Sequence, residues 1–129
     1  MTPAQWDICA WRTTVFAETY TFGISGTPID ITGNSFRMQI RNYAGEPGSP
    51  LVDLETVDDE TAEGIFIIDA TQGQIGVRIE DTTLAALPGL VPAPLPSTFS
   101  YDLIVIDTDG DALGPAMQGS FTLYEGVTV

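Results

Sequence analysis

The chain has 129 residues, the size of one domain, and a chain of this length buries roughly two-thirds of its unfolded surface. It carries 18 Asp and Glu residues against four Arg, with no Lys and no His, so the formal net charge is −14. We expect no binding to nucleic acid or to anionic membranes, because both need a basic surface. Without His or Lys the commonest general bases and nitrogen ligands are missing, and we predict no enzyme, no cofactor and no metal site.

The acidic charge has two interpretations that the sequence leaves open: solubility with repulsion between copies, or docking on a basic partner surface. The single cysteine, Cys9, lies in an apolar run, and we expect it to be a small buried hydrophobic residue. The first residues lack the pattern of a signal peptide, and no apolar run approaches the roughly 20 residues of a membrane span. We therefore expect a soluble protein made in a cytoplasm.

The N-terminal third contains aromatic residues in two segments. Residues 1–13 include Trp6 and Trp11 and form either an edge strand or an arm whose tryptophans dock on a neighbour; the edge strand is favoured, because Trp most often serves a core. Residues 14–22 are typical of a strand with its aromatic side chains on one face. Glu18 shares that face, which indicates either a bulge or a strand end open to water.

The clearest strand is 35–41, which follows a turn at 30–34. Phe36, Met38 and Ile40 alternate with polar residues, so they face a core. Arg37 and Arg41 lie on the other face. We expect them to pair with carboxylates of neighbouring strands, and this outer face could pack on another acidic copy.

The middle of the chain predicts three further elements. Residues 51–56 form a short strand with Val52 and Leu54 inward, and the acidic loop 58–63 is interpreted as solvated, with weak calcium binding as an alternative. Residues 65–69 are apolar on both faces, which favours a central strand. Residues 74–80 alternate with their aliphatic side chains inward.

A helical turn near 82–87 and a proline-rich loop at 88–97 come next. Asp81 or Thr82 is the expected cap of the turn, and Pro88 and Gly89 end it. The loop holds four prolines, so we expect an extended, stiff backbone. Leu90, Val91 and Leu95 are then either a partner patch or part of a lid over one end of the fold, and the lid is at least as well supported.

The C-terminal third predicts a hairpin. Residues 98–107 are the most apolar strand, the Asp-Gly turn at 107–111 is a hairpin signal, and 118–125 returns with Phe121 and Leu123 inward. The turn lacks the Gly and Glu that a calcium loop needs at its sixth and twelfth positions. The whole pattern predicts a single all-β domain over 1–129, an immunoglobulin-like antiparallel β-sandwich of about seven or eight strands with one short helical turn.

The order of short motifs resembles a group of small tailed-bacteriophage proteins and is similar to the immunoglobulin-like N-terminal domain of phage upper-baseplate proteins. The resemblance covers about 100 residues. It is carried by these pieces: Asp30-Ile31-Thr32-Gly33, Phe36-Arg37-Met38-Gln39-Ile40-Arg41, Gly64-Ile65-Phe66-Ile67-Ile68-Asp69, Gly73-Gln74-Ile75, Thr83-Leu84-Ala85-Ala86-Leu87-Pro88, Tyr101-Asp102-Leu103, Asp109-Gly110 and Gly119-Ser120-Phe121-Thr122-Leu123. The longer proline loop and the segment with two tryptophans depart from the pattern.

The resemblance implies a virion structural protein, an adaptor of the tail tip, baseplate or fibre attachment that is assembled in the host cytoplasm. A capsid decoration protein and a free carbohydrate- or protein-binding module are the alternatives. The implied partners are other virion proteins with a basic docking surface, and a symmetric homo-oligomer is expected in the particle. The candidate partner contacts are Trp6, Trp11, Leu90, Val91, Leu95, Arg37 and Arg41.

Overall fold

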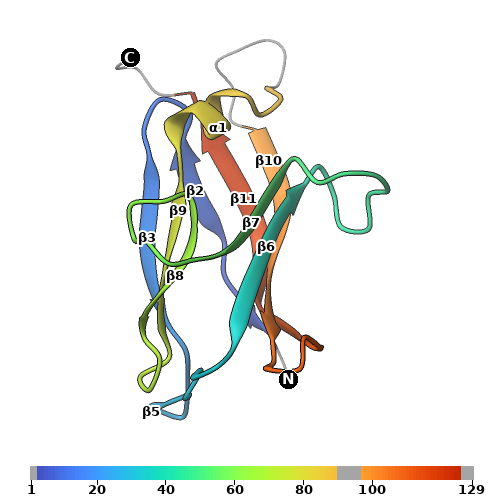
Figure 1. The fold of residues 1–129 in the computed structure, drawn as a ribbon. Helices are drawn as coiled ribbons and strands as arrows, with labels where there is room; N and C mark the ends of the chain where they lie inside the picture. The colour runs from blue at the N-terminus through green and yellow to red at the C-terminus, as the bar shows by residue number, and fades with distance from the viewer. Residues whose placement is uncertain (1–2, 90–96, 126–129) are drawn as a thin grey trace.

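The computed structural model describes residues 3–89 and 97–125. Two layers of strands face each other (Figure 1), and the hydrophobic core lies between them. The first layer contains β1 (Ala4–Gln5), β2 (Ile8–Trp11), β11 (Ala112–Tyr124), β10 (Ser97–Ile106), β6 (Ser35–Arg41) and β7 (Val52–Val57). The second layer contains β3 (Phe16–Thr21), β9 (Gln74–Ile79) and β8 (Gly64–Asp69). A small hairpin, β4 (Gly23–Ile24) and β5 (Thr27–Pro28), and one helix, α1 (Asp81–Ala85), complete the elements.

The strand order confirms the predicted immunoglobulin-like sandwich. One layer has the order β11-β10-β6-β7 and the other β8-β9-β3, which matches the arrangement of strands G-F-C-C′ and D-E-B in that architecture. Eight strands in the described part have four residues or more. Most pairs are antiparallel, but β1 and β2 run parallel to β11, and β7 pairs with β8 in parallel over two residues.

The core lies between the layers and follows the predicted alternation. On β6, Phe36, Met38 and Ile40 are buried while the residues between them are half-buried. The inward residues predicted on the other strands are buried as well: Val52, Leu54, Ile75, Val77, Ile79, Phe99, Tyr101, Leu103, Val105, Phe121 and Leu123. Ile65, in the strand predicted to be apolar on both faces, is also buried. These side chains belong to one continuous cluster that includes residues of both layers.

Helix α1 closes one end of the sandwich, at the top of Figure 1, with Leu84 and Leu87 buried. The predicted cap is wrong in position: the N-cap is Glu80, whose side chain forms no capping hydrogen bond, and Asp81 accepts only from the backbone N–H of the next residue, Thr82 (2.8 Å). Glu63 takes this role from the acidic loop, because its carboxylate accepts hydrogen bonds from the backbone N–H of Glu80 (2.8 Å) and the hydroxyl of Thr83 (2.6 Å). A carboxylate distant in sequence therefore holds the start of the helix.

Two strands differ from their predictions. β8 is a central strand between β7 and β9, as predicted, but its second face is covered only in part, since Phe66 is half-buried and Ile68 is exposed. β11 begins at Ala112 and not at residue 118, because the ladder with β10 continues through Pro115 at a register shift. Proline is tolerated at such an irregularity, where no ladder hydrogen bond is lost. The helix of the described part is too short to cross a membrane.

Candidate binding groove

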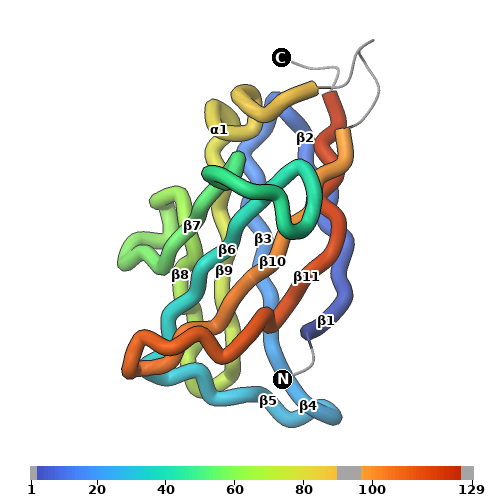
Figure 2. The backbone as a smooth tube through the Cα atoms, turned by 90° about the vertical axis from the view of Figure 1, so that its right-hand side faces the viewer, coloured from blue at the N-terminus to red at the C-terminus, as the bar shows by residue number. Residues whose placement is uncertain are grey.

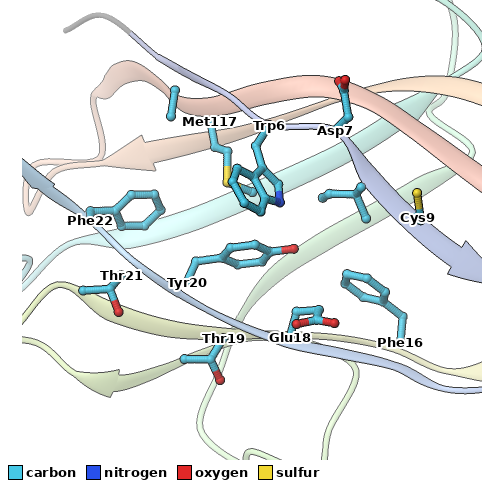
Figure 3. Close-up of a pocket in the computed structure, with 12 residues that line it drawn as sticks. Trp6, Asp7, Cys9, Phe16, Glu18, Thr19, Tyr20, Thr21, Phe22 and Met117 are labelled. Atoms are coloured by element: carbon cyan, nitrogen blue, oxygen red, sulfur yellow. The ribbon is translucent and has the colours of Figure 1, made fainter.

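A groove runs along one long side of the sandwich, between β3 and the N-terminal strands. Its walls come from β3 of one layer and from residues 4–9, which lie on β11 of the other layer. The groove has a volume of about 540 Å³. It is lined by Ala4, Trp6, Asp7, Ile8, Cys9, Phe16, Glu18, Thr19, Tyr20, Thr21, Phe22 and Met117. We call it the seam groove, because it lies where the two layers meet without a strand in common (Figure 3).

The N-terminal wall is fixed to β11 and β10 by named contacts. The backbone N–H of Trp6 donates to the carbonyl of Gln118 (2.9 Å), and the Asp7 carboxylate accepts from the backbone N–H of Ser120 (3.1 Å). The hydroxyl of Tyr101 donates to the carbonyl of Trp6 (2.5 Å). These contacts confirm the edge strand that was favoured within residues 1–13: β1 and β2 pair with β11, and Figure 2 shows them beside it.

Glycine at position 119 permits this close approach. A Cβ atom built there would collide with the carbonyl oxygen of Trp6, and it would also lie 2.9 Å from a carboxylate oxygen of Asp7. Contacts below 3 Å are shorter than packed carbon and oxygen atoms tolerate. Gly119 belongs to one of the short motifs that carry the family resemblance, and its physical role in this chain is to let the N-terminal wall lie against β11.

The second wall is β3, which pairs with β9 alone among the described strands. Phe16 is buried, Tyr20 is half-buried and Glu18 between them is exposed, although all three lie on the inward face. The ladder with β9 is continuous from Phe16 to Thr21, so no bulge is present and the other interpretation holds: the strand is open to water. Figure 3 shows the rings of Trp6 and Tyr20 pointing toward each other across the groove.

The electrostatics of the groove are those of an acidic, apolar site. Burial, followed by the nearby charge of Glu18, raises the pKa of the Tyr20 phenol. Burial also raises the pKa of Tyr101, with smaller effects of Tyr20 and Asp7. Both phenols are therefore neutral hydrogen-bond donors near pH 7. The carboxylate of Glu18 forms no hydrogen bond or ion pair with any residue in 3–89 or 97–125.

A second, apolar hollow adjoins the seam groove and shares Ala4 and Phe22 with it. Its volume is about 590 Å³, and Ile24 of the β4–β5 hairpin and Leu113 of β11 line it. Both of these side chains are largely exposed, Ile24 at 69% and Leu113 at 47%. Together with Trp6, exposed at 56%, they add exposed apolar surface beside the part of the seam groove near Ala4 and Phe22.

All four arginines form hydrogen bonds or ion pairs with other residues of the chain. Arg37 pairs with Asp53 of β7 at 2.6 Å, as predicted, and this hydrogen bond lowers the pKa of Asp53. Arg41 does not form the predicted ion pair with a carboxylate; it donates to the carbonyls of Glu46 and Gly48 and so holds the loop after β6. Arg78 pairs with Glu80 at 2.9 Å. On the outer face of β6, the charge of Arg37 is therefore paired with a carboxylate, whereas Arg41 keeps its charge and directs its donors to carbonyls of its own loop.

The fourth arginine, Arg12, has a role that sequence reasoning missed. It pairs with Glu125 at 2.5 Å and donates to the carbonyl of Leu87 at 2.6 Å, with longer bonds to the carbonyls of Leu84, Ala85 and Pro88. Carbonyls at the end of a helix lack intrahelical partners, and a cation there satisfies them. Arg12 therefore ties three parts of the chain together: the segment after β2, the end of α1 and the end of β11.

The other predicted contact residues have separate positions. Trp11 lies on the outer face of β2, where its ring stacks on Tyr124 with centroids 5.4 Å apart, and it is 49% exposed. The expectation that the tryptophans serve the core is wrong for both Trp6 and Trp11. Cys9 is exposed and not buried, because Ile8 and Ala10 take the inward positions of β2. Leu90, Val91 and Leu95 lie outside the described residues.

No family model matches the chain, and no curated protein sequence matches it. In the described part of the chain no group of three or more His, Cys, Asp or Glu side chains is arranged to hold a metal ion. The Asp107 carboxylate accepts from the backbone N–H groups of Asp109 and Asp111, both at 2.9 Å, so it stabilises the hairpin turn. Within the described residues, the seam groove, with its acidic and aromatic lining, is the candidate site for binding another molecule.

Proposed function

We propose that the chain is a non-enzymatic structural protein of a bacteriophage virion, an assembly or adaptor module of the tail tip, baseplate or fibre attachment. The family resemblance supplies the virion context. The observation that supports a binding role is the charge arrangement: 18 acidic residues meet four arginines, all of which are engaged in internal contacts. The surface left for a partner is therefore acidic, and it suits a basic docking surface.

The exposed aromatic residues support the same role. Trp6 lies in the seam groove and Trp11 on the outer face of β2, both at the edge of the sandwich that β1 and β2 form. Interfaces between proteins are rich in tryptophan and tyrosine, because these rings bury a large area at a low entropy cost. An edge with two exposed tryptophans is more consistent with docking than with a solvated surface.

Quantitative mass spectrometry of purified virions tests the proposal. A handful of copies per particle is the result expected for the tail, and hundreds of copies would instead support the capsid decoration protein. Release of the chain at high ionic strength is expected in either location, since charge contacts weaken with salt. Absence of the chain from washed particles would overturn both virion roles.

A second candidate is a free carbohydrate-binding module, and the stacked pair of Trp11 and Tyr124 favours it. The rings lie 26° from parallel on an exposed surface, and flat apolar faces of this kind suit the C–H faces of sugar rings. A glycan array with the wild-type chain and with Trp11→Ala would test this role. Binding that disappears in the variant would support the free module, and no binding to any glycan would reject it.

A further inference from the structure

The free edge of β3 is the feature from which we infer more. In an immunoglobulin-like sandwich a further strand, A, commonly pairs with strand B. Here β3 has the place of strand B, but the N-terminal segment pairs with β11 instead, through β1 and β2. Among the residues that the structure describes, no strand covers the outer edge of β3. Alternate N–H and C=O groups of its six residues therefore lack a ladder partner.

We propose that the β3 edge and the seam groove bind an extended, positively charged segment of a partner protein, which adds to the sheet as a strand. This inference rests on the proposed adaptor function and specifies its partner. Addition of a strand to an exposed edge takes its affinity from main-chain hydrogen bonds and its specificity from pockets for alternate side chains. The seam groove supplies those pockets, and Figure 3 shows the side chains that line them.

Charge decides between the two kinds of strand that could occupy the edge. A second copy would bring its own β3, whose sequence FAETYT contains Glu18 and no cation, together with another net charge of −14. Like charges across an interface act against the wrong partner. An inward-pointing charge on an edge strand is one of the devices that prevent self-pairing. The unpaired Glu18 therefore disfavours a copy and selects a segment with Lys or Arg opposite it.

The faces of β3 predict the pattern of the partner segment. Side chains that enter the groove beside Phe16 and Tyr20 meet aromatic rings, so they should be apolar, with a basic residue between them opposite Glu18. The outward side chains lie next to Ala17, Thr19 and Thr21 and should be small or polar. A further apolar side chain beyond the end of β3 would reach the hollow at Ile24 and Leu113.

The probe is a synthetic peptide in which every second residue is threonine. The residues between the threonines are, in order, valine, arginine and valine. Amide hydrogen exchange by NMR measures the effect on β3. We expect the peptide to slow exchange of alternate amides in Phe16–Thr21 and to leave β10, which pairs with β6 on one edge and β11 on the other, unchanged. Two control peptides separate the contributions: one with glutamate for arginine should bind more weakly, and one with N-methylated alternate amides should not bind.

Two variants, each of which removes one negative charge from the chain, are compared for binding of the peptide. Glu18→Gln should weaken binding of the arginine peptide about fivefold, the effect of one exposed charge pair. Asp58→Asn changes the net charge equally in the loop after β7, outside the groove, and should have no such effect. Exchange rates on β3 that do not change at high peptide concentration would overturn the inference. Equal binding of the N-methylated peptide, or a β3-mediated dimer of the chain alone in sedimentation, would also overturn it.

The failure of this inference is distinguishable from that of the adaptor function. If the chain is found in virions and the Glu18→Arg variant is incorporated as well as wild type, the proposal that β3 binds a basic segment is wrong while the virion role stands. If the chain is absent from virions but the peptide still protects β3, the edge binds a basic strand and the proposed location is wrong.

Discussion

The two long sides of the sandwich differ in how the layers meet. On one side β7 belongs to both layers, because Val52–Glu55 pair with β6 and Thr56 and Val57 pair with β8. On the other side β3 and the N-terminal strands belong to one layer each, and the seam groove separates them. The shared strand joins the two layers by backbone hydrogen bonds, so they meet here without a groove of the kind seen on the other side. The side without a shared strand exposes tryptophan, tyrosine and glutamate, so the closed side serves stability and the open side is available for binding.

The largest expected effect tests where stability resides. Phe36→Ala and Leu103→Ala remove fully buried side chains between the layers and should each lower the free energy of unfolding by about 2–5 kcal/mol. Trp6→Ala on the open side removes a larger but exposed ring and should cost under about 1 kcal/mol. Urea denaturation followed by circular dichroism measures all three. Equal losses for Phe36→Ala and Trp6→Ala would mean that the seam groove is part of the core.

The second largest effect is expected where Arg12 holds the end of α1 against the end of β11. Arg12→Met keeps the length of the side chain and removes its ion pair with Glu125 and its bonds to the last carbonyls of α1. Hydrogen bonds to charged groups contribute about 1.5–3 kcal/mol, and this guanidinium is only 15% exposed, so a loss in that range is expected. Glu125→Gln keeps the bonds to the helix and should cost less. Losses of the same size in both variants would show that the ion pair alone matters.

A third change should detach the N-terminal wall. Gly119→Ala places a methyl group against the carbonyl of Trp6, and overpacking of this kind costs about 1–3 kcal/mol. Residues 4–7 should then leave β11, which would appear as faster hydrogen exchange at Trp6 and a change in its fluorescence. Gly110→Ala is a matched control for loss of a glycine at positive φ, since a Cβ there meets no atom within 4 Å. Unchanged exchange at Trp6 would contradict the close contact.

The smallest effect is expected on the closed side. Asp53→Asn removes the ion pair with Arg37, which lies on the outer surface and is largely open to water. The hydrogen bond from Arg37 lowers the pKa of Asp53 below its ordinary 3.8, so the pair stabilises the fold above pH 3.8, and this contribution is lost as the pH falls through the lowered pKa. Denaturation midpoints of variant and wild type should differ slightly at pH 7 and converge in acid. A difference that grows below pH 3.8 would have the wrong sign.

The sequence predicted the strands and their inward faces because alternation is a local signal, and Phe36, Leu103 and Phe121 all lie where it places them. It misplaced Cys9, because a four-residue apolar run does not show which of its two faces is inward. It missed the Arg12–Glu125 pair, whose members are 113 residues apart, and the contact of Glu63 with the start of α1. These contacts depend on which strands become neighbours, and a local pattern carries no information about that.

The sequence predicted only part of the seam groove. The exposed position of Glu18 on an inward face was an anomaly in the alternation, and the structure explains it by the missing strand beside β3. The two tryptophans were recognised as candidate contacts, yet their exposure follows from the parallel pairing of residues 4–11 with β11. No propensity distinguishes that pairing from an antiparallel one with β3.

The reactivity of Cys9 tests the open side most directly, because it is the only cysteine of the chain and it lines the seam groove. We predict that a maleimide labels Cys9 in the native chain at a rate within about tenfold of the rate in denaturant, as expected for an accessible thiol. The peptide that pairs with β3 should slow this labelling. A native rate lower by several orders of magnitude, as a buried thiol would show, would contradict the open groove and the account built on it.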